Sequence, residues 1–170
     1  MSPEIIKGFV ILACIFIPLE RIFALHNQKV FRRGWKTDAT YFFTGHFIGR
    51  SGAIAVAVTL SLMTDLFNPE LQSKIASQPI WLQFAEAIVI SDLAYYIAHR
   101  LLHEIPWLWQ FHAVHHSIEH MDWLAAVRVH PCEQLFTQIC KMMPLYWLGF
   151  TKETFAVYAL YSAAIAFIIH

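Results

Sequence analysis

The sequence predicts an all-α fold, an integral membrane helical bundle with about four or five membrane helices. Hydrophobic residues make up 58% of its 170 residues, charged residues make up 14%, and the mean hydropathy is +0.49. In typical soluble chains, apolar residues make up about 45–50% and charged residues about 25%. A soluble domain this small could not bury so much apolar surface, because its surface is large relative to its volume. The apolar residues also gather in runs, several of them close to the roughly 20 residues that a helix needs to cross a bilayer.

The length predicts a single membrane domain over residues 1–170, since domains usually have about 100–200 residues. We divide it into N-terminal membrane helices over 1–79 and a histidine-rich region over 80–170. The formal net charge is zero and no basic run interleaves with aromatic residues, so nucleic acid is not expected as a partner. The three cysteines show no CxxC spacing, which argues against a cysteine zinc site.

The N-terminal part contains two long apolar runs, at about 5–25 and about 40–63. Each is long enough to cross a bilayer as a helix. A polar, basic segment separates them. Residues 65–79 are polar and carry two prolines, so this segment is predicted to be a loop.

The third apolar run, at 80–98, leads directly into His99. Residues 100–131 are too polar to span and are expected at or just outside the membrane interface, where tryptophan is favoured. This segment contains Trp107, Trp109 and Trp123. Two shorter runs follow, at about 133–150 and 153–169. Each is barely long enough to span, so a helical hairpin dipping into the bilayer is the alternative.

The distribution of basic residues orients these runs in the membrane. One side carries six basic residues, namely Lys29, Arg32, Arg33, Lys36, Arg100 and Arg128, and the other carries three, namely Lys7, Lys74 and Lys152. The positive-inside rule makes the first side cytoplasmic. We therefore expect an integral protein of the bacterial inner membrane or endoplasmic reticulum, with residues 99–131 and His170 on the cytoplasmic side.

Seven of the ten histidines lie between residues 92 and 131. His99 and His103 are four residues apart, so both imidazoles lie on one helical face. His112, His115 and His116 share a second face by the same argument. Pro106 is expected to end the first helix and to let the second turn back against it.

Five imidazoles in eighteen residues are too many for one structural zinc, which takes four ligands, so the spacing suggests two metal ions. Imidazole suits iron, zinc, copper and nickel, and the spacing alone does not select among them. His130 and His170 are further candidate ligands. Asp92, Tyr96 and Arg128 are expected to support the ligands, with Asp92 either binding metal or orienting an imidazole. No catalytic residue is expected beyond the metal ligands.

The combined pattern is Asp92-x-x-x-Tyr96-x-x-His99-Arg100-x-x-His103, then Pro106-x-Leu108-Trp109-x-Phe111-His112-x-x-His115-His116-Ser117, then Arg128-x-His130-Pro131. It resembles the fatty acid hydroxylase/sterol desaturase superfamily of integral membrane non-haem di-iron enzymes. The resemblance implies that the five clustered histidines bind two iron ions, and it makes His130 and His170 plausible ligands.

The resemblance also implies an oxidoreductase of lipid metabolism, which uses O₂ and two electrons to hydroxylate or desaturate a fatty acyl chain or sterol. The lipid substrate would come from the bilayer. No haem, flavin or iron–sulfur motif is visible, so a separate electron-donor protein is expected.

The pattern of the superfamily has a further His-x-x-His-His cluster downstream, and this sequence ends at His170 without one. We therefore expect a C-terminally truncated member that holds one iron well and the second poorly. This expectation puts the activity of the 170-residue piece in doubt.

Two other classes of protein also place histidines on helices. A membrane zinc hydrolase needs a glutamate base within His-Glu-x-x-His, but Arg100, Leu101 and Leu102 stand between His99 and His103. A metal-ion transporter needs ligands near mid-membrane, and a haem electron carrier needs only paired histidines. The cluster instead follows the end of an apolar run.

Overall fold

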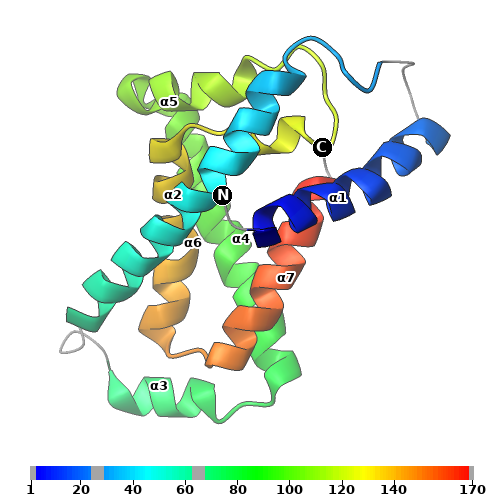
Figure 1. Cartoon of the computed structure of the whole chain (residues 1–170). Coiled ribbons are helices and arrows are strands. Elements are labelled where there is room, and N and C mark those ends of the chain that lie inside the picture. Colours follow the sequence, from blue (N-terminus) through cyan, green and yellow to red (C-terminus); the bar gives the residue numbers. More distant parts are fainter. Residues whose placement is uncertain (1–2, 24–28, 63–67, 169–170) are drawn as a thin grey trace.

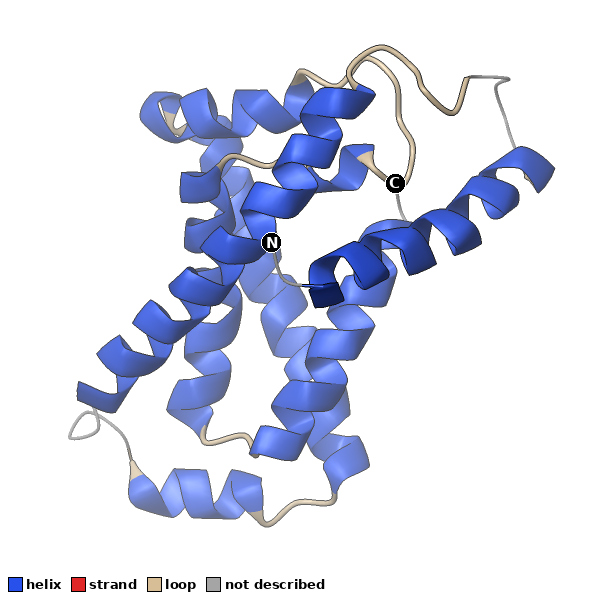
Figure 2. Cartoon of the chain, in the orientation of Figure 1, coloured by secondary structure: helices blue, strands red, loops and turns tan. Residues whose placement is uncertain are grey.

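The computed structural model describes residues 3–23, 29–62 and 68–168, and the regular structure in these ranges is helical (Figure 2). The helices are α1 (Pro3–Ile22), α2 (Trp35–Leu62), α3 (Pro69–Ala76), α4 (Ile80–Glu104), α5 (Pro106–His116), the short 3₁₀ helix η2 (Ala125–Val127), α6 (Pro131–Leu148) and α7 (Lys152–Ile168). The prediction of an all-α chain is confirmed for this part of the chain.

Helix α4 is the axis around which the other helices pack. It contacts α5, α6 and α7, while α6 also contacts α2, α3 and α5. Figure 1 shows α5 across one end of this bundle and α3 across the other, with α1 crossing in front of α7. The histidine-bearing ends of α4 and α5 therefore lie at the end of the molecule opposite α3.

Helix α4 runs past the predicted end of the third apolar run, Ala98, and stops at Glu104. It is long and apolar enough to cross a membrane by length and composition, and it is the one such helix among the described residues. The last turns of α4 thus continue the same helix beyond the apolar run, and they carry His99 and His103.

The prediction of a loop over residues 65–79 is wrong where the structure describes it, because α3 occupies Pro69–Ala76. Asn68 caps this helix, since its side-chain oxygen accepts hydrogen bonds from the N–H groups of Glu70 (3.0 Å) and Leu71 (3.2 Å). The proline that suggested a loop occupies the first helical turn, where its missing N–H costs nothing and its fixed φ favours the helix.

A tight turn at Gly149 joins α6 to α7 and packs against α3. Gly149 ends α6 in the left-handed conformation, with φ of +84°. A Cβ atom at this position would lie 2.5 Å from the Cβ of Gln72 on α3. Glycine is therefore required here both for its conformation and for the close approach of the two segments.

The buried Gln83 ties α3, α4 and α7 together at the same end of the bundle. Its amide nitrogen donates to the carbonyl oxygens of Ala76 (3.3 Å) and Gln78 (2.9 Å). Its oxygen accepts from the N–H of Thr151 (3.1 Å) and the hydroxyl of Thr154 (2.9 Å). Next to it lies an apolar core, which contains Ala87, Leu145, Phe150 and Tyr158. This end of the bundle is thus firmly packed and holds α4 in place.

Candidate metal centre

The break between α4 and α5 brings two histidine pairs together. Ile105 is extended, with φ of −97° and ψ of 115°, because the ring of Pro106 disfavours a helical conformation for the preceding residue. Pro106 then starts α5, which packs back against α4. The predicted helical turn-back at Pro106 is present.

Four imidazoles meet at this turn, those of His99, His103, His112 and His116. The Nε2 atoms of His99 and His103 are 3.1 Å apart, those of His103 and His112 are 3.2 Å apart, and those of His112 and His116 are 3.0 Å apart. One nitrogen of each ring lies within 4.8 Å of every other. The two predicted helical faces therefore converge on one point.

Glu133, in the first turn of α6, contacts this cluster through His112. Its Oε1 lies 2.7 Å from Nδ1 of His112, and both side chains are buried. Burial raises the pKa of Glu133 to about 7. Burial, and then the neighbouring imidazoles, lower the pKa of His112 to about 4. His112 is therefore neutral at pH 7, and an Nδ1–H that donates to Glu133 leaves Nε2 free to bind a metal ion.

His115 and His130 lie outside the group of four imidazoles. Nδ1 of His115 lies 3.4 Å from the carbonyl oxygen of Arg128, and its ring centroid is 5.7 Å from that of His112. His130 precedes α6 and its Nδ1 accepts a hydrogen bond from the N–H of Cys132 (3.1 Å), so it caps this helix. Its ring centroid is 4.8 Å from that of Phe111.

The residues expected to support the ligands have different neighbours. Asp92 is exposed on α4, seven residues before His99. Tyr96 is exposed on α4. Arg128 contacts His115 through its carbonyl oxygen, as described above, and its guanidinium group points to Asp38.

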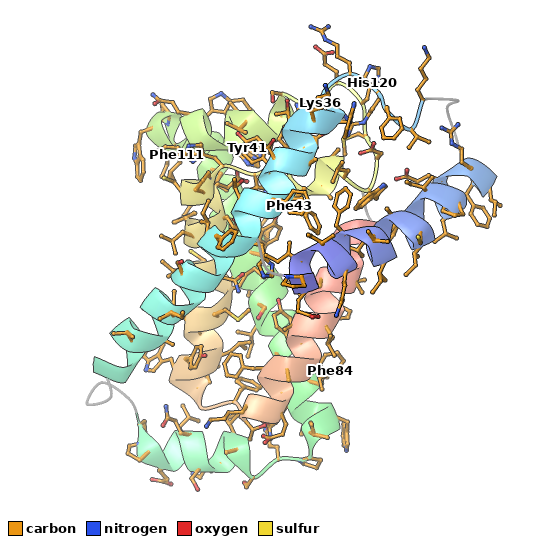
Figure 3. All side chains as sticks on the ribbon, in the orientation of Figure 1. Lys36, Tyr41, Phe43, Phe84, Phe111 and His120 are labelled. Carbon is orange, nitrogen blue, oxygen red and sulfur yellow. The ribbon has the colours of Figure 1, made fainter. Side chains whose placement is uncertain are left out.

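The last predicted ligand and one more histidine complete the description of this region. His170 falls outside the described residues, so its role as a ligand stays a prediction. His120 is exposed, and Figure 3 shows it at the same end of the molecule as Lys36, in the loop that follows α5.

Sequence reasoning missed Glu133 and Tyr95. The ring of Tyr95 is 5.6 Å from that of His99, one helical turn away. A carboxylate in the first turn of a helix is common and stabilises the helix dipole by itself. The signal that could have identified Glu133 was its place three residues after His130 in a helix that starts at Pro131.

The four imidazoles fit a transition-metal ion. An ion bonded to nitrogen at about 2.1 Å holds neighbouring ligand atoms roughly 3.0–3.4 Å apart, which agrees with the three measured contacts. Among the described residues, the buried Nδ1 of His99 and Oε2 of Glu133 have no hydrogen-bond partner. The donor set consists of neutral imidazoles with an adjacent carboxylate, which suits divalent iron and zinc alike.

Comparison with known proteins gives the site a context. Residues 84–170, half of the chain, match the fatty acid hydroxylase family. The chain is 35% identical over 92 residues to an ornithine lipid hydroxylase, OlsE, of Rhizobium tropici, and 26% identical over 83 residues to an alkylglycerol monooxygenase of Caenorhabditis elegans. These stretches cover 54% and 49% of this chain, but only 28% and 16% of the two relatives. No solved structure is significantly similar to the chain.

Proposed function

The chain belongs to the fatty acid hydroxylase family, and from this we propose that it is the metal-bearing part of a membrane-bound, non-haem di-iron enzyme that uses O₂ to hydroxylate or desaturate a lipid. Hydroxylation is the better supported of the two reactions. One of the two relatives named above is a lipid hydroxylase and the other is a monooxygenase. The substrate class is a fatty acyl chain or sterol of the bilayer.

The observation that carries this proposal is the group of four convergent imidazoles. His99 and His103 from α4, with His112 and His116 from α5, would hold one iron ion. A second iron would use His115, with His130 or His170. Bound iron supplies the activation of O₂, which protein side chains alone cannot achieve.

The chain's own residues would prepare and shield this centre. Glu133 would accept a hydrogen bond from Nδ1–H of His112 and so leave Nε2 to face the metal. The ring of Trp109 lies 5.4 Å from those of His103 and His116, and it covers the cluster with an apolar surface. Such a cover limits access of water to the reacting atoms.

The lipid would reach the site along α4. Val89, Leu93 and Ile97 are exposed apolar side chains on this helix, on the way to His99. Their exposure suits contact with acyl chains, and a bilayer is the solvent in which such a surface is stable. We place the metal centre at the cytoplasmic face, where a separate electron-donor protein would supply the two electrons.

Metal analysis of the protein purified in detergent tests the metal centre. We expect iron, with no Soret band in the optical spectrum, and loss of most of that iron in His112→Gln. His46→Gln is the matched control, because His46 is exposed on α2 and belongs to no described metal group. Zinc alone, a haem spectrum, or full iron content in His112→Gln would contradict the proposal.

Mass spectrometry of lipids from cells that express the protein tests the reaction. Hydroxylation adds one oxygen atom to a lipid, whereas desaturation removes two hydrogen atoms. We expect one of these products with wild type and neither with His112→Gln. An unchanged lipid profile in cells with iron-loaded wild-type protein would contradict the proposed reaction but not the metal centre.

A further inference from the structure

A buried ion network joins the segment before α2 to the loop between α5 and α6, which we call the histidine loop (residues 117–130). Arg32 donates to both carboxylate oxygens of Asp122, from Nε at 2.7 Å and from Nη2 at 2.5 Å. The same Nη2 donates to Oδ2 of Asp38 at 2.8 Å. Asp38 has no exposed surface, and Arg32 is 5% exposed.

Asp38 extends this network to Arg128 in the histidine loop. Its second oxygen, Oδ1, accepts a hydrogen bond from Nε of Arg128. Gly34 leaves room for this contact, because a Cβ there would lie 2.7 Å from Nη2 of Arg128, and its φ of +88° also favours glycine. Both oxygens of the buried carboxylate are therefore engaged by guanidinium groups.

Arg128 in turn contacts a predicted metal ligand. Its carbonyl oxygen lies 3.4 Å from Nδ1 of His115. A neutral imidazole that donates from Nδ1 keeps Nε2 as its acceptor, which is the form that binds a metal ion. The carbonyl oxygen of Arg128 can therefore accept a hydrogen bond from Nδ1–H of His115, which favours the tautomer with Nε2 as the acceptor.

Buried ion pairs of this kind are weak evidence for stability, since desolvation of the charges offsets their attraction. Their better-attested use is to specify one arrangement among several. Here two arginines and two carboxylates define how the histidine loop sits against residues 32–38. That segment lies outside residues 84–170, which match the family.

We propose that Asp38 is a positioning residue of the metal centre, which holds Arg128 and, through its carbonyl, presents His115 to a metal ion. This inference rests on the proposed function, because it assumes that His115 binds a metal. Asp38 itself does not touch the metal. The first turn of α2, which carries Asp38, would thereby help to assemble a site whose predicted ligands lie outside α2.

The first test measures the tautomer of His115 by ¹⁵N NMR in the metal-free protein, with His115→Gln used to assign the signal. We expect the Nδ1–H form in wild type and a mixture of tautomers in Asp38→Asn. Glu119→Gln is the matched control, because Glu119 pairs with Arg33 between the same two segments at 3.5 Å but on the surface. The control should keep the wild-type signal.

The second test measures the affinity for Co²⁺ by titration in the visible spectrum, again on the whole chain. Loss of a group that orients a ligand typically weakens metal binding by about 10–100-fold. We expect such a loss at one ion in Asp38→Asn and in Arg128→Gln, and about the same loss, not the product of the two, in the double variant. Glu119→Gln should stay within about twofold of wild type.

The outcomes separate the two claims. Wild type that binds no Co²⁺ through histidine overturns the proposed function. Wild type that binds Co²⁺ while Asp38→Asn binds it equally, with His115 unchanged, overturns the positioning role. The positioning role is also overturned if the loss of Co²⁺ affinity in the double variant equals the product of the two single losses, since Asp38 would then act independently of Arg128. If Asp38→Asn does not fold, Arg128→Gln decides by the same two measurements, because Arg128 lies nearer the surface.

Discussion

At the scale of single residues, the pair formed by Glu133 and His112 controls the charge at the centre of the imidazole cluster. Burial raises the pKa of Glu133 to about 7 and lowers that of His112 to about 4, so the metal-free site favours the neutral form of both. A metal ion at Nε2 would change this preference. The positive charge of the ion would favour a carboxylate that accepts the Nδ1 proton.

The sign of each contribution to stability follows from these shifts. The raised pKa of Glu133 gives a contribution that is present below its ordinary value of 4.5 and is lost as the pH rises through about 7. The lowered pKa of His112 gives a contribution to stability that is complete above pH 6.5 and is lost as the pH falls towards 4. Between about pH 4 and pH 7 these two contributions to stability therefore change in opposite directions, and they offset each other in the metal-free protein.

Glu133→Gln should therefore have opposite effects on the metal-free and the metal-bound protein. Without metal, its melting temperature relative to wild type should rise from about pH 5 to about pH 8, because the variant has no buried carboxyl group to ionise. With metal, its affinity for iron or Co²⁺ should be about 10–100-fold weaker. Thermal unfolding at several pH values and metal titration measure these two effects.

Glu153→Gln is the matched control, since Glu153 is an exposed carboxylate in the first turn of α7. It should change neither the slope with pH nor the metal affinity. A Glu133→Gln protein that binds metal as well as wild type would show that Glu133 does not support His112.

At the scale of elements, the packing of α3 against the turn between α6 and α7 contributes to the stability of the bundle. Gln72 of α3 lies against Gly149, and its amide nitrogen donates to the carbonyl oxygen of Trp147 at 3.2 Å. This contact joins the two elements at the end opposite the histidines. It stabilises the helices that carry the site without touching the site itself.

Gly149→Ala should destabilise the protein by more than about 1–2 kcal/mol, which is the cost of a left-handed conformation for a residue with a Cβ. The clash with Gln72 adds to that cost. Gly8→Ala is the matched control, because Gly8 lies within α1 and an added Cβ meets nothing within 4 Å. The control should be neutral or gain about 0.5–1 kcal/mol.

Chemical unfolding of the detergent-solubilised variants, followed by circular dichroism, measures both changes. Equal stability of Gly149→Ala and wild type would mean that α3 moves away from the turn at little cost. Metal content should be unchanged in both variants whenever they are folded.

At the scale of the whole molecule, many large apolar side chains are exposed, which agrees with the proposed membrane location. They occur on α1, α4 and α7, and they include Ile11, Val89, Leu93 and Leu160, which are more than half exposed. Exposed apolar surface on this scale is expected of a protein surrounded by lipid. The proposed bilayer would cover these faces and leave the histidine end at the interface.

Val89→Lys should weaken membrane integration, because Val89 lies near the middle of α4 and is 67% exposed. A lysine at the centre of a membrane helix costs about 2.5–3.5 kcal/mol. Ser73→Lys is the matched control, since Ser73 is exposed on α3 at the end of the bundle. Alkaline carbonate extraction of membranes measures the fraction that stays integrated.

We expect wild type and Ser73→Lys to remain in the membrane pellet, and Val89→Lys to be partly released or degraded. Complete extraction of wild type would contradict the proposed membrane bundle. Equal retention of all three proteins would show that Val89 does not face lipid.

The sequence by itself determined the features that depend on neighbouring residues. The apolar runs predicted the long helices, the spacing of His99 and His103 predicted their shared face, and Pro106 predicted the turn between α4 and α5. The combined histidine pattern also indicated the family, and the comparisons confirm it. The two iron ions, the role of His170, the cytoplasmic side and the electron donor stay predictions.

Only the tertiary structure decided which distant groups meet these histidines. It placed Glu133 against His112 and joined Asp38 to Arg128 across ninety positions of sequence. Helical periodicity states which face a side chain occupies, but it does not state which other helix packs against that face. That partner depends on the crossing of α2, α4 and α6 and on the path of the loops between them, which arise only when the whole chain packs.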